Sequence, residues 1–449
     1  MAQMGVMDAS LCPPFHGRSV DKGTRRRPRW VLLDKLAYFA GADVRNATTA
    51  TSKTREGHEI QVTLCTAAQP PLVSYVCVHS PTLNPKTNDF AMEPQIIAAH
   101  DDLLLIRLIL GRGNRFTVSL ADYFVYQASI ADDIPPSLTR ITHPGPMITF
   151  TNHEVSILHY IPEPQDINEP LISNKQRYIV TALSVNRFRP PGEYELHLYH
   201  SHTQQWTAAH FDLGATVPPL LGLSYFHHRT TNVINLTHQS PGLMAFVDLW
   251  QGLLLINVLD KVQPAAPRYI PLPPPLKQGK VISGRVDPTD VRDIAVDAKG
   301  HINFVELEVD AIQHESDRTG YISQGWTVAK WSCSNTESDD CCWHMDCKLN
   351  ASDISHLMPP ELPNYCHPTP TLERLHIGHP LLSLDNNGDV VYFMAKVDHR
   401  DYKAWVIPFD MRKRLIHEPA VFEGAPRTLG IGSTFIQTTI SNYPQPAPG

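Results

Sequence analysis

Short strand-like segments follow one another along the chain from residue 30 onward. Residues 193–199 alternate most clearly, because the apolar Tyr194 and Leu196 are separated by the polar Glu195, and this is the period of a half-buried β-strand. Proline accounts for 39 of the 449 residues, which disfavours long helices. We therefore predict a mostly β protein. Further apolar strand segments lie at 30–33, 60–64, 74–78, 123–126 and 178–180.

A strand–Asp–Gly–strand pattern occurs three times, with its aspartates at Asp248, Asp297 and Asp385. The aspartate closes an Asx turn and the glycine supplies the positive φ of a tight hairpin, so each copy is predicted to form a hairpin turn. The aspartates are 49 and 88 residues apart, and 88 is twice 44. A period of roughly 40–50 residues is typical of propeller blades.

A second hairpin recurs in segments 196–206, 254–273 and 404–422. Two hairpins per repeat give four strands, which make one blade, so we predict an all-β, propeller-like array of about six blades, with five to seven compatible. A two-sheet sandwich array would share the alternation but not the period. The expected core includes Val247, Leu253, Leu255, Ile294, Val296 and Phe304.

The predicted propeller occupies residues 30–425 as one domain. Residues 1–29 are expected to be a disordered basic tail, whose run from Arg25 to Arg29 is either a targeting signal or a solvated lead-in. Residues 333–378, rich in cysteine, proline and polar side chains, are expected to be a loop inserted between blades. Residues 426–449 are expected to be a proline-rich tail.

Composition narrows the class of partner. The net charge of −7 argues against nonspecific nucleic-acid binding. The longest apolar run, 103–110, is broken by Arg107 and is far shorter than the ~20 residues that cross a bilayer, so we expect no membrane association. Eight cysteines are few for this length, and the N-terminus lacks an apolar signal sequence. These features favour a cytoplasmic or nuclear protein.

Cysteine and histidine cluster in the expected insertion. Its weak candidates for zinc are Cys342, His344, Cys347 and Cys366, of which only Cys342 and Cys347 approach the usual ligand spacing. The favoured interpretation is reduced cysteines in a polar loop, with no metal and no cofactor.

Recognised catalytic motifs are absent from the sequence. There is no G-x-S-x-G, and the glycine pair at Gly111 and Gly113 satisfies neither a dinucleotide fingerprint nor a P-loop. Asp101 and Asp102 are adjacent, and adjacent strand residues point to opposite faces, so we expect them to be poor partners in one active site.

Several segments resemble a plant family, expanded in grasses, that carries domain of unknown function 1618. The resemblance covers most of residues 30–425, is densest over about 245–395, and implies a fold like the β-propeller modules attached to F-box proteins. The family has no established reaction, so it implies no catalytic residue. Only 29 residues precede Trp30 and they contain no F-box, so a role in a ubiquitin ligase would need a box from another chain. The segments that carry the resemblance are 30–34, 46–50, 122–126, 247–255, 292–296 and 303–307.

These observations favour a non-enzymatic scaffold that presents propeller loops to an unidentified protein partner, of which a ubiquitin-ligase component is one class. The alternative is a hydrolase with its site in the central channel, which predicts ionisable side chains converging on the axis. The candidate interaction residues are Trp250, in a predicted blade turn, and Trp343, in the expected insertion. A turn tryptophan that folds back to seal its own blade is the alternative for Trp250.

Overall fold

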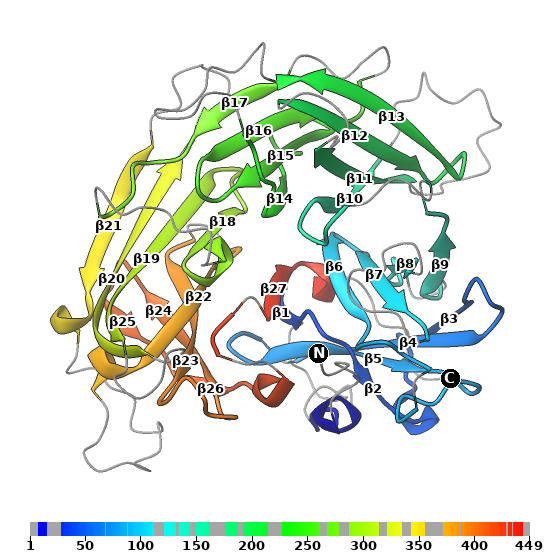
Figure 1. Ribbon diagram of the computed structural model, residues 1–449, viewed down its shortest axis with the longest axis horizontal. Coiled ribbons are helices and arrows are strands. Elements are labelled where there is room, and N and C mark those ends of the chain that lie inside the picture. The colour runs from blue at the N-terminus through cyan, green and yellow to red at the C-terminus, as the bar shows by residue number, and fades with distance from the viewer. Residues whose placement is uncertain are drawn as a thin grey trace.

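The protein is a ring of six β-sheets around a central axis (Figure 1), which confirms the predicted all-β propeller. The computed structural model describes residues 8–15, 28–67, 69–87, 89–111, 121–131, 134–143, 145, 150–161, 177–185, 192–213, 227–260, 267–277, 287–313, 321–334, 343–354, 371–385, 388–427, 430–432 and 434–442.

Blades two to five each contain four antiparallel strands, and the chain moves from the axis outward. Blade two contains β6 (Gln95–His100), β7 (Leu103–Ile109), β8 (Ala121–Gln127) and β9 (Ser137–Ile141). Blade three contains β10 (Val155–Tyr160), β11 (Arg177–Val185), β12 (Glu193–His200) and β13 (Gln205–Asp212). Blade four contains β14 (Asn232–Asn235), β15 (Leu243–Asp248), β16 (Gly252–Asn257) and β17 (Arg268–Pro271). Blade five contains β18 (Arg292–Val296), β19 (Ile302–Gln313), β20 (Tyr321–Cys333) and β21 (His344–Asn350).

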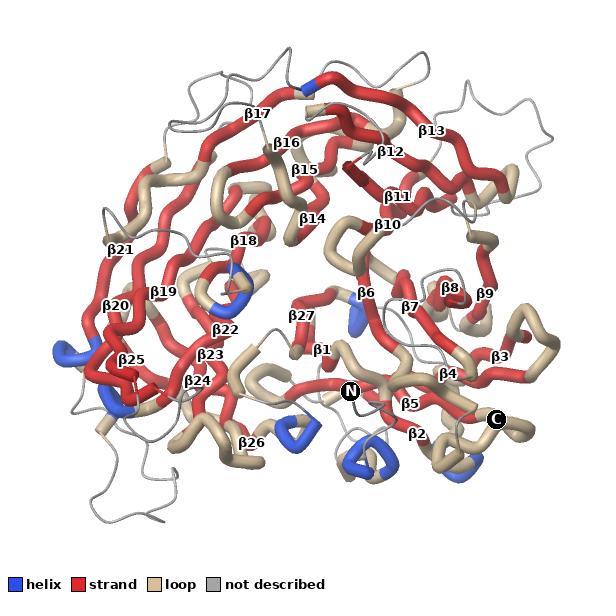
Figure 2. Tube along the Cα trace, in the orientation of Figure 1, coloured by secondary structure: helices blue, strands red, loops and turns tan. Residues whose placement is uncertain are grey.

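Blades six and one are less regular. Blade six contains β22 (His376–Leu382), β23 (Val390–Lys396), β24 (Trp405–Asp410), β25 (Leu415–Ile416) and β26 (Ala420–Val421). Blade one has the order β27 (Phe435–Thr438), β1 (Val31–Asp34), β5 (Val73–His79), β4 (Glu59–Cys65) and β3 (Ala50–Lys53), and β2 (Tyr38–Phe39) pairs with β5. Short 3-10 helices connect the strands (Figure 2): η1 (Asp8–Leu11), η2 (Ala42–Val44), η5 (Pro288–Asp290), η6 (Ala351–Asp353), η8 (Leu372–Arg374), η9 (Ala425–Arg427) and η10 (Ile440–Asn442).

The two ends of the chain close the ring inside blade one. The C-terminal β27 pairs antiparallel with the N-terminal β1, with Phe435 opposite Asp34. Arg427, the last residue of η9, is buried and forms an ion pair with Asp34. These contacts join segments almost 400 residues apart, so the two ends of the chain share one sheet and close the ring.

Apolar clusters lie between neighbouring blades, which explains why a second strand such as β7 is buried along its whole length. One cluster joins blades one and two, for example, through Leu33 and Ile106. The predicted core residues Val247, Leu253, Leu255, Ile294 and Phe304 are all buried. Val296 is only half-buried, because it lines the central channel.

Asp248, Asp297 and Asp385 close hairpin turns, as predicted, but the turns do not all join the same pair of strands in their blades. Asp248 joins the second and third strands of blade four, whereas Asp297 and Asp385 each join the first and second strands of their blades. The 44-residue period is therefore wrong, because loops of unequal length separate the blades. Their innermost strands begin at Gln95, Val155, Asn232, Arg292, His376 and Phe435.

Two expected irregular segments contain blade strands. The expected insertion 333–378 contains β21, the outermost strand of blade five. That prediction failed because an outermost strand is largely solvated and carries polar residues. The expected tail 426–449 contains β27, an innermost strand only four residues long. In the expected N-terminal tail, Ser10 is buried and donates a hydrogen bond to Glu93, while residues 16–27 lie outside the described residues.

Candidate functional site

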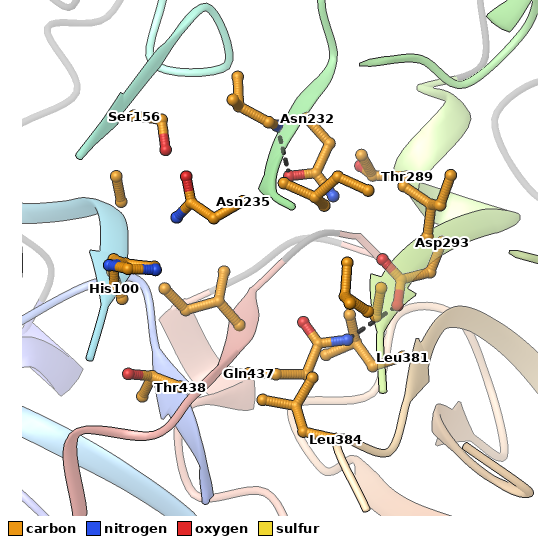
Figure 3. A pocket seen from close by; sticks show the side chains of 18 of the residues that line it. His100, Ser156, Asn232, Asn235, Thr289, Asp293, Leu381, Leu384, Gln437 and Thr438 are labelled. Atoms are coloured by element: carbon orange, nitrogen blue, oxygen red, sulfur yellow. Dashed lines mark hydrogen bonds between the residues drawn. The ribbon is translucent and has the colours of Figure 1, made fainter. Parts of the chain in front are cut away.

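A cavity of about 430 Å³ occupies the axis of the ring. The innermost strands of all six blades line it, and residues such as Ser156, Asn235, Asp293 and Gln437 surround the same space (Figure 3). We call it the channel. Its first mouth is the end at which the innermost strands begin, and its second mouth is the end at which they finish.

Charged side chains gather at the first mouth from loops of several blades. Lys35 follows β1, His153 precedes β10, and Arg229 precedes β14. Asp287 directly precedes η5, and Asp290 is the last residue of η5, just before β18. Arg229 and Asp287 are exposed, whereas the other three side chains are half-buried. The first mouth therefore presents both signs of charge around one opening.

Local structure fixes the position of these groups. Asp287 caps η5, since its Oδ1 accepts hydrogen bonds from the Thr289 backbone N–H (3.0 Å) and hydroxyl (2.7 Å). The backbone N–H of Arg229 donates to Asp248 Oδ2 at 2.9 Å. At Gly378, a Cβ would lie 3.0 Å from the Asp290 carbonyl oxygen and 2.6 Å from Ile431. The glycine therefore permits β22 to approach η5 closely.

Mutual electrostatics shift the pKa values of this group. Burial lowers the pKa of Lys35 to about 8, against the opposing effect of the nearby carboxylates. Burial and the negative charge of Asp287 raise the pKa of Asp290 to about 7. Burial also acts on Asp287, but the two hydrogen bonds from Thr289 hold its pKa below the usual value. Burial and the charge of Lys35 lower the pKa of His153 to about 4.

Two ionisable groups inside the channel bind neighbouring blades together. Asp293 Oδ2 in β18 accepts hydrogen bonds from the Leu382 backbone N–H at 2.9 Å and from Gln437 Nε2 at 2.8 Å. The ring nitrogens of His379 lie 3.3 Å from the Thr289 carbonyl oxygen and 3.0 Å from the Phe435 carbonyl oxygen. Both side chains are buried, and each connects blades five, six and one.

A second polar cluster lies at the second mouth, where the Asp101–Asp102 pair forms the turn between β6 and β7. Both carboxylates approach His159 Nδ1, at 3.8 Å for Asp101 and 3.1 Å for Asp102. The expectation that these neighbours diverge is wrong, because the residues lie in a turn and Asp101 has a φ of +50°. Burial opposes protonation of His159, but the hydrogen bond and charge of Asp102 raise its pKa overall.

The two candidate interaction tryptophans are both half-buried and in contact with the protein. Trp250 stacks on Arg292, whose guanidinium carbon lies 4.6 Å from the ring centroid. Arg292 in turn forms a buried ion pair with Glu306 at 2.8 Å. Trp343 donates a hydrogen bond from Nε1 to the Pro271 carbonyl oxygen at 2.8 Å. Trp343 therefore connects the outer strand of blade five to blade four, whereas Trp250 covers the start of β18.

Replacing Trp250 with alanine is expected to lower the free energy of unfolding by about 2 kcal/mol, the value of a desolvated cation–π contact. The reason is that Arg292 is only 3% exposed and would lose the ring that covers it. Chemical denaturation measures the change, and Trp250→Phe is the control that keeps an aromatic face. A loss below about 0.5 kcal/mol for Trp250→Ala, as for an ordinary surface substitution, would contradict the contact.

The stability contribution of Asp290 is expected to depend on pH. Its pKa is raised from 3.8 to about 7, so the folded state retains a proton that the unfolded state releases, and stability falls as pH rises through that interval. Asp290→Asn carries no charge at any of these pH values. The variant should therefore gain thermal stability relative to the wild type between acidic and mildly alkaline pH.

The control for this measurement is Asp310→Asn, because Asp310 has an exposed side chain. Melting midpoints of both variants are recorded across the pH range, and the difference from the wild type should change more with pH for Asp290→Asn than for Asp310→Asn. An equal change for both variants would show that burial does not perturb the Asp290 carboxyl.

The cysteine and histidine candidates do not converge where the structure describes them. His344 is exposed on β21 and Cys347 is half-buried on the same strand, while Cys342 and Cys366 lie outside the described residues. Within the described part of the chain no group of three or more His, Cys, Asp or Glu side chains could hold a metal ion. Cys333 is disulfide-bonded, so the expectation of reduced cysteines is wrong there.

Sequence reasoning did not identify the charged groups of the first mouth. Lys35, His153, Arg229 and Asp290 stand singly in unrelated segments, and only the closed ring brings them together. The one local signal was the Asx-capped turn 287–290 directly before a strand.

Among the described residues no helix is long and apolar enough to cross a membrane.

A search of the curated proteins found no match. The family comparison found one segment, which begins in β15 of blade four, contains all of blade five, and ends in β23 of blade six. It includes Trp250, Asp293 and both partners of the Arg292–Glu306 ion pair. Residues 246–392 match the family described as a protein of unknown function, DUF1618, which confirms the resemblance over that segment.

Proposed function

We propose that the protein is a non-enzymatic binding module that docks a protein partner on the loops around the first mouth of the channel. The observation that carries this proposal is the convergence of exposed, oppositely charged side chains there. Arg229 and Asp287 come from blades four and five, and both act electrostatically on His153 of blade three. Complementary charge at an interface selects partners and accelerates their encounter.

The ionisable side chains inside the channel support a non-enzymatic role, because their polar atoms contact neighbouring blades. Asp293 accepts hydrogen bonds from β22 and β27, and His379 lies between two carbonyl oxygens. A general acid or base needs a proton that it can exchange with substrate. Groups whose polar atoms hold blades together are better suited to keeping the ring closed.

The proposal includes a class of partner and a location. The resemblance to F-box-associated propellers favours a ubiquitin-ligase component as partner. The proposed location is the cytoplasm or nucleus, because eight cysteines are few for 449 residues, although Cys333 is disulfide-bonded. Imaging of a fluorescent fusion tests this location.

The test is a comparative capture experiment with charge variants. Arg229→Glu and Asp287→Asn change the first mouth, and asparagine keeps the capping acceptor of η5. Arg412→Glu is the matched control, since Arg412 is an exposed residue in the turn between β24 and β25, at the opposite end of the strands. Wild type, variants and control are used as baits in extracts of plant tissue, with quantitative mass spectrometry.

A partner recovered by the wild type and by Arg412→Glu, but reduced at least tenfold with Arg229→Glu or Asp287→Asn, supports the proposal. Recovery that is equal for all four baits places the interface elsewhere on the protein. Melting curves of the variants ensure that a loss of capture is not a loss of folding.

A hydrolase site at the first mouth is the second candidate. The specific observation is that neighbouring carboxyls have pKa values shifted apart, with Asp290 raised to about 7 and Asp287 lowered, as in an acid–base pair. Assays of the purified protein with chromogenic glycosides and esters test it. Turnover that Asp290→Asn abolishes would establish the hydrolase and overturn the non-enzymatic proposal.

A further inference from the structure

The channel itself offers a second kind of site, separate from the loops of the first mouth. Its volume of about 430 Å³ falls within the range of roughly 300–1,000 Å³ that is typical of small-molecule pockets. Figure 3 shows Ser156, Asn235 and Gln437 around this space, from blades three, four and one.

The polar groups that line the channel combine donors and acceptors without using all of them on the protein. Asn232 accepts from the Val233 backbone N–H with Oδ1 at 2.8 Å, which leaves its Nδ2 group as a donor. Gln437 uses Nε2 on Asp293 and on the Leu382 carbonyl oxygen, which leaves Oε1 as an acceptor. Asn235 donates from Nδ2 to the Ile157 carbonyl oxygen at 3.3 Å.

Two further polar groups line the channel, the side-chain oxygen of Asn235 and the ring of His100. Asn235 Oδ1 is buried and has no hydrogen-bond partner among the described residues, and a buried acceptor of this kind requires a partner. His100 accepts from the His159 backbone N–H through Nδ1 at 3.1 Å, and burial lowers its pKa. Because Nδ1 accepts, the neutral form of the ring carries its proton on Nε2, which makes Nε2 a donor.

Apolar side chains also line the channel, together with charged residues near its mouths such as Lys35 and Asp101. The central carboxylate, Asp293, has its Oδ2 occupied by hydrogen bonds from the protein. Ile97, Val155, Leu381, Leu384 and Ile436 contribute hydrocarbon surface between the polar groups. Asp293 accepts its bonds from β22 and β27, as described above. Such a cavity suits a ligand with several hydroxyl groups, each both donor and acceptor, on a compact hydrocarbon frame. It is poorly suited to an anion or a metal ion.

We propose that the channel binds a neutral carbohydrate through Ser156, Asn232, Asn235, Gln437 and His100. The ligand has two possible sources, a free small sugar or the terminal sugar of a glycan attached to a protein. This site goes beyond the proposed docking of a partner at the first mouth, and it holds whether or not that docking occurs.

Ligand-observed NMR and calorimetry test the site with named probes: glucose, galactose, mannose, xylose and sucrose as free sugars, and a released high-mannose N-glycan as the glycan. Ser156→Ala removes one hydroxyl and Asn232→Leu removes one amide donor. Each should weaken binding by up to about tenfold, the factor that corresponds to one hydrogen bond of about 1.4 kcal/mol. Ser334→Ala, at an exposed serine, is the control and should bind like the wild type.

Saturation transfer to a free sugar, weakened by both channel variants, supports the site and identifies a small-sugar ligand. Transfer to the N-glycan alone, with the same dependence, supports the site and identifies a glycan ligand. No binding of any probe at millimolar concentration overturns the proposal. Binding that neither Ser156→Ala nor Asn232→Leu weakens also overturns it, because the sugar would then bind elsewhere. Neither negative result bears on the capture experiment, which uses different variants.

Discussion

Replacing Arg427 with methionine is expected to lower the free energy of unfolding by about 3–5 kcal/mol, the usual cost of leaving a buried charge without its partner. Arg427 pairs with Asp34, and both residues are buried. It also donates to the carbonyl oxygens of Leu36 at 2.9 Å and Ala37 at 3.1 Å, and its guanidinium lies 3.6 Å from the Tyr38 ring centroid. The substitution would therefore leave a carboxylate and two carbonyls unsatisfied.

Lys413→Met is the matched control for this measurement. Lys413 also forms an ion pair, with Asp410, but its own side chain is 72% exposed. Asp410 keeps the hydrogen bond from the Lys413 backbone N–H at 2.7 Å in the variant, so the loss should be about 0–1 kcal/mol. Urea denaturation of both variants compares the two pairs directly. Equal losses for Arg427→Met and Lys413→Met would show that the Arg427 contacts do not hold the ends of the chain together.

Truncation of Phe435 to alanine is expected to have an effect of the same size, about 3–5 kcal/mol, as for other buried phenylalanines. Phe435 is fully buried and its ring contacts Phe422 at a centroid distance of 5.4 Å and His379 at 4.7 Å. The variant leaves a void between blades six and one, at the position where β27 closes the ring.

Phe15→Ala serves as the control, because Phe15 is 86% exposed and its removal should change stability by no more than about 0.5 kcal/mol. Thermal and urea unfolding of the pair report the difference. A loss for Phe435→Ala that is no larger than for Phe15→Ala would mean that β27 adds little to the ring.

The propeller could be predicted from the sequence because its strands and turns are local features. Alternation at 193–199 and the Asx turns at Asp297 and Asp385 depend on neighbouring residues only. The number of residues per blade could not be derived in the same way. Asp248 has the same local signature as the other two aspartates but joins a different pair of strands, and local turn chemistry does not distinguish these positions.

The two segments that were misassigned have a common physical cause. A strand can be recognised from its pattern when one face is buried and the other solvated. β21 is mostly exposed, and β27 has four residues without a clear alternation. Tertiary pairing rather than residue pattern makes these segments strands.

The charged groups of the first mouth depend on closure of the whole ring. Lys35 is near Asp287, Asp290 and Asp293, more than 250 residues away in sequence. No local pattern connects these residues, since their proximity results from the paired ends of the chain. Trp250 and Trp343, in contrast, could be selected as unusual aromatic residues outside the predicted strands, and a packed Trp250 was one of the two alternatives. Its contact with Arg292 and the hydrogen bond of Trp343 to Pro271 depend on tertiary packing and could not be derived from the sequence.

Closure of the ring by β27 is the central claim, because the channel and both of its mouths depend on it. Hydrogen–deuterium exchange of the unmodified protein tests it most directly. The amides of Phe435–Thr438 should be protected to the same degree as those of Val31–Asp34, their partners in the sheet. Exchange of Phe435–Thr438 at the rate of surface loops, while the innermost strands of the other blades stay protected, would contradict the closed ring.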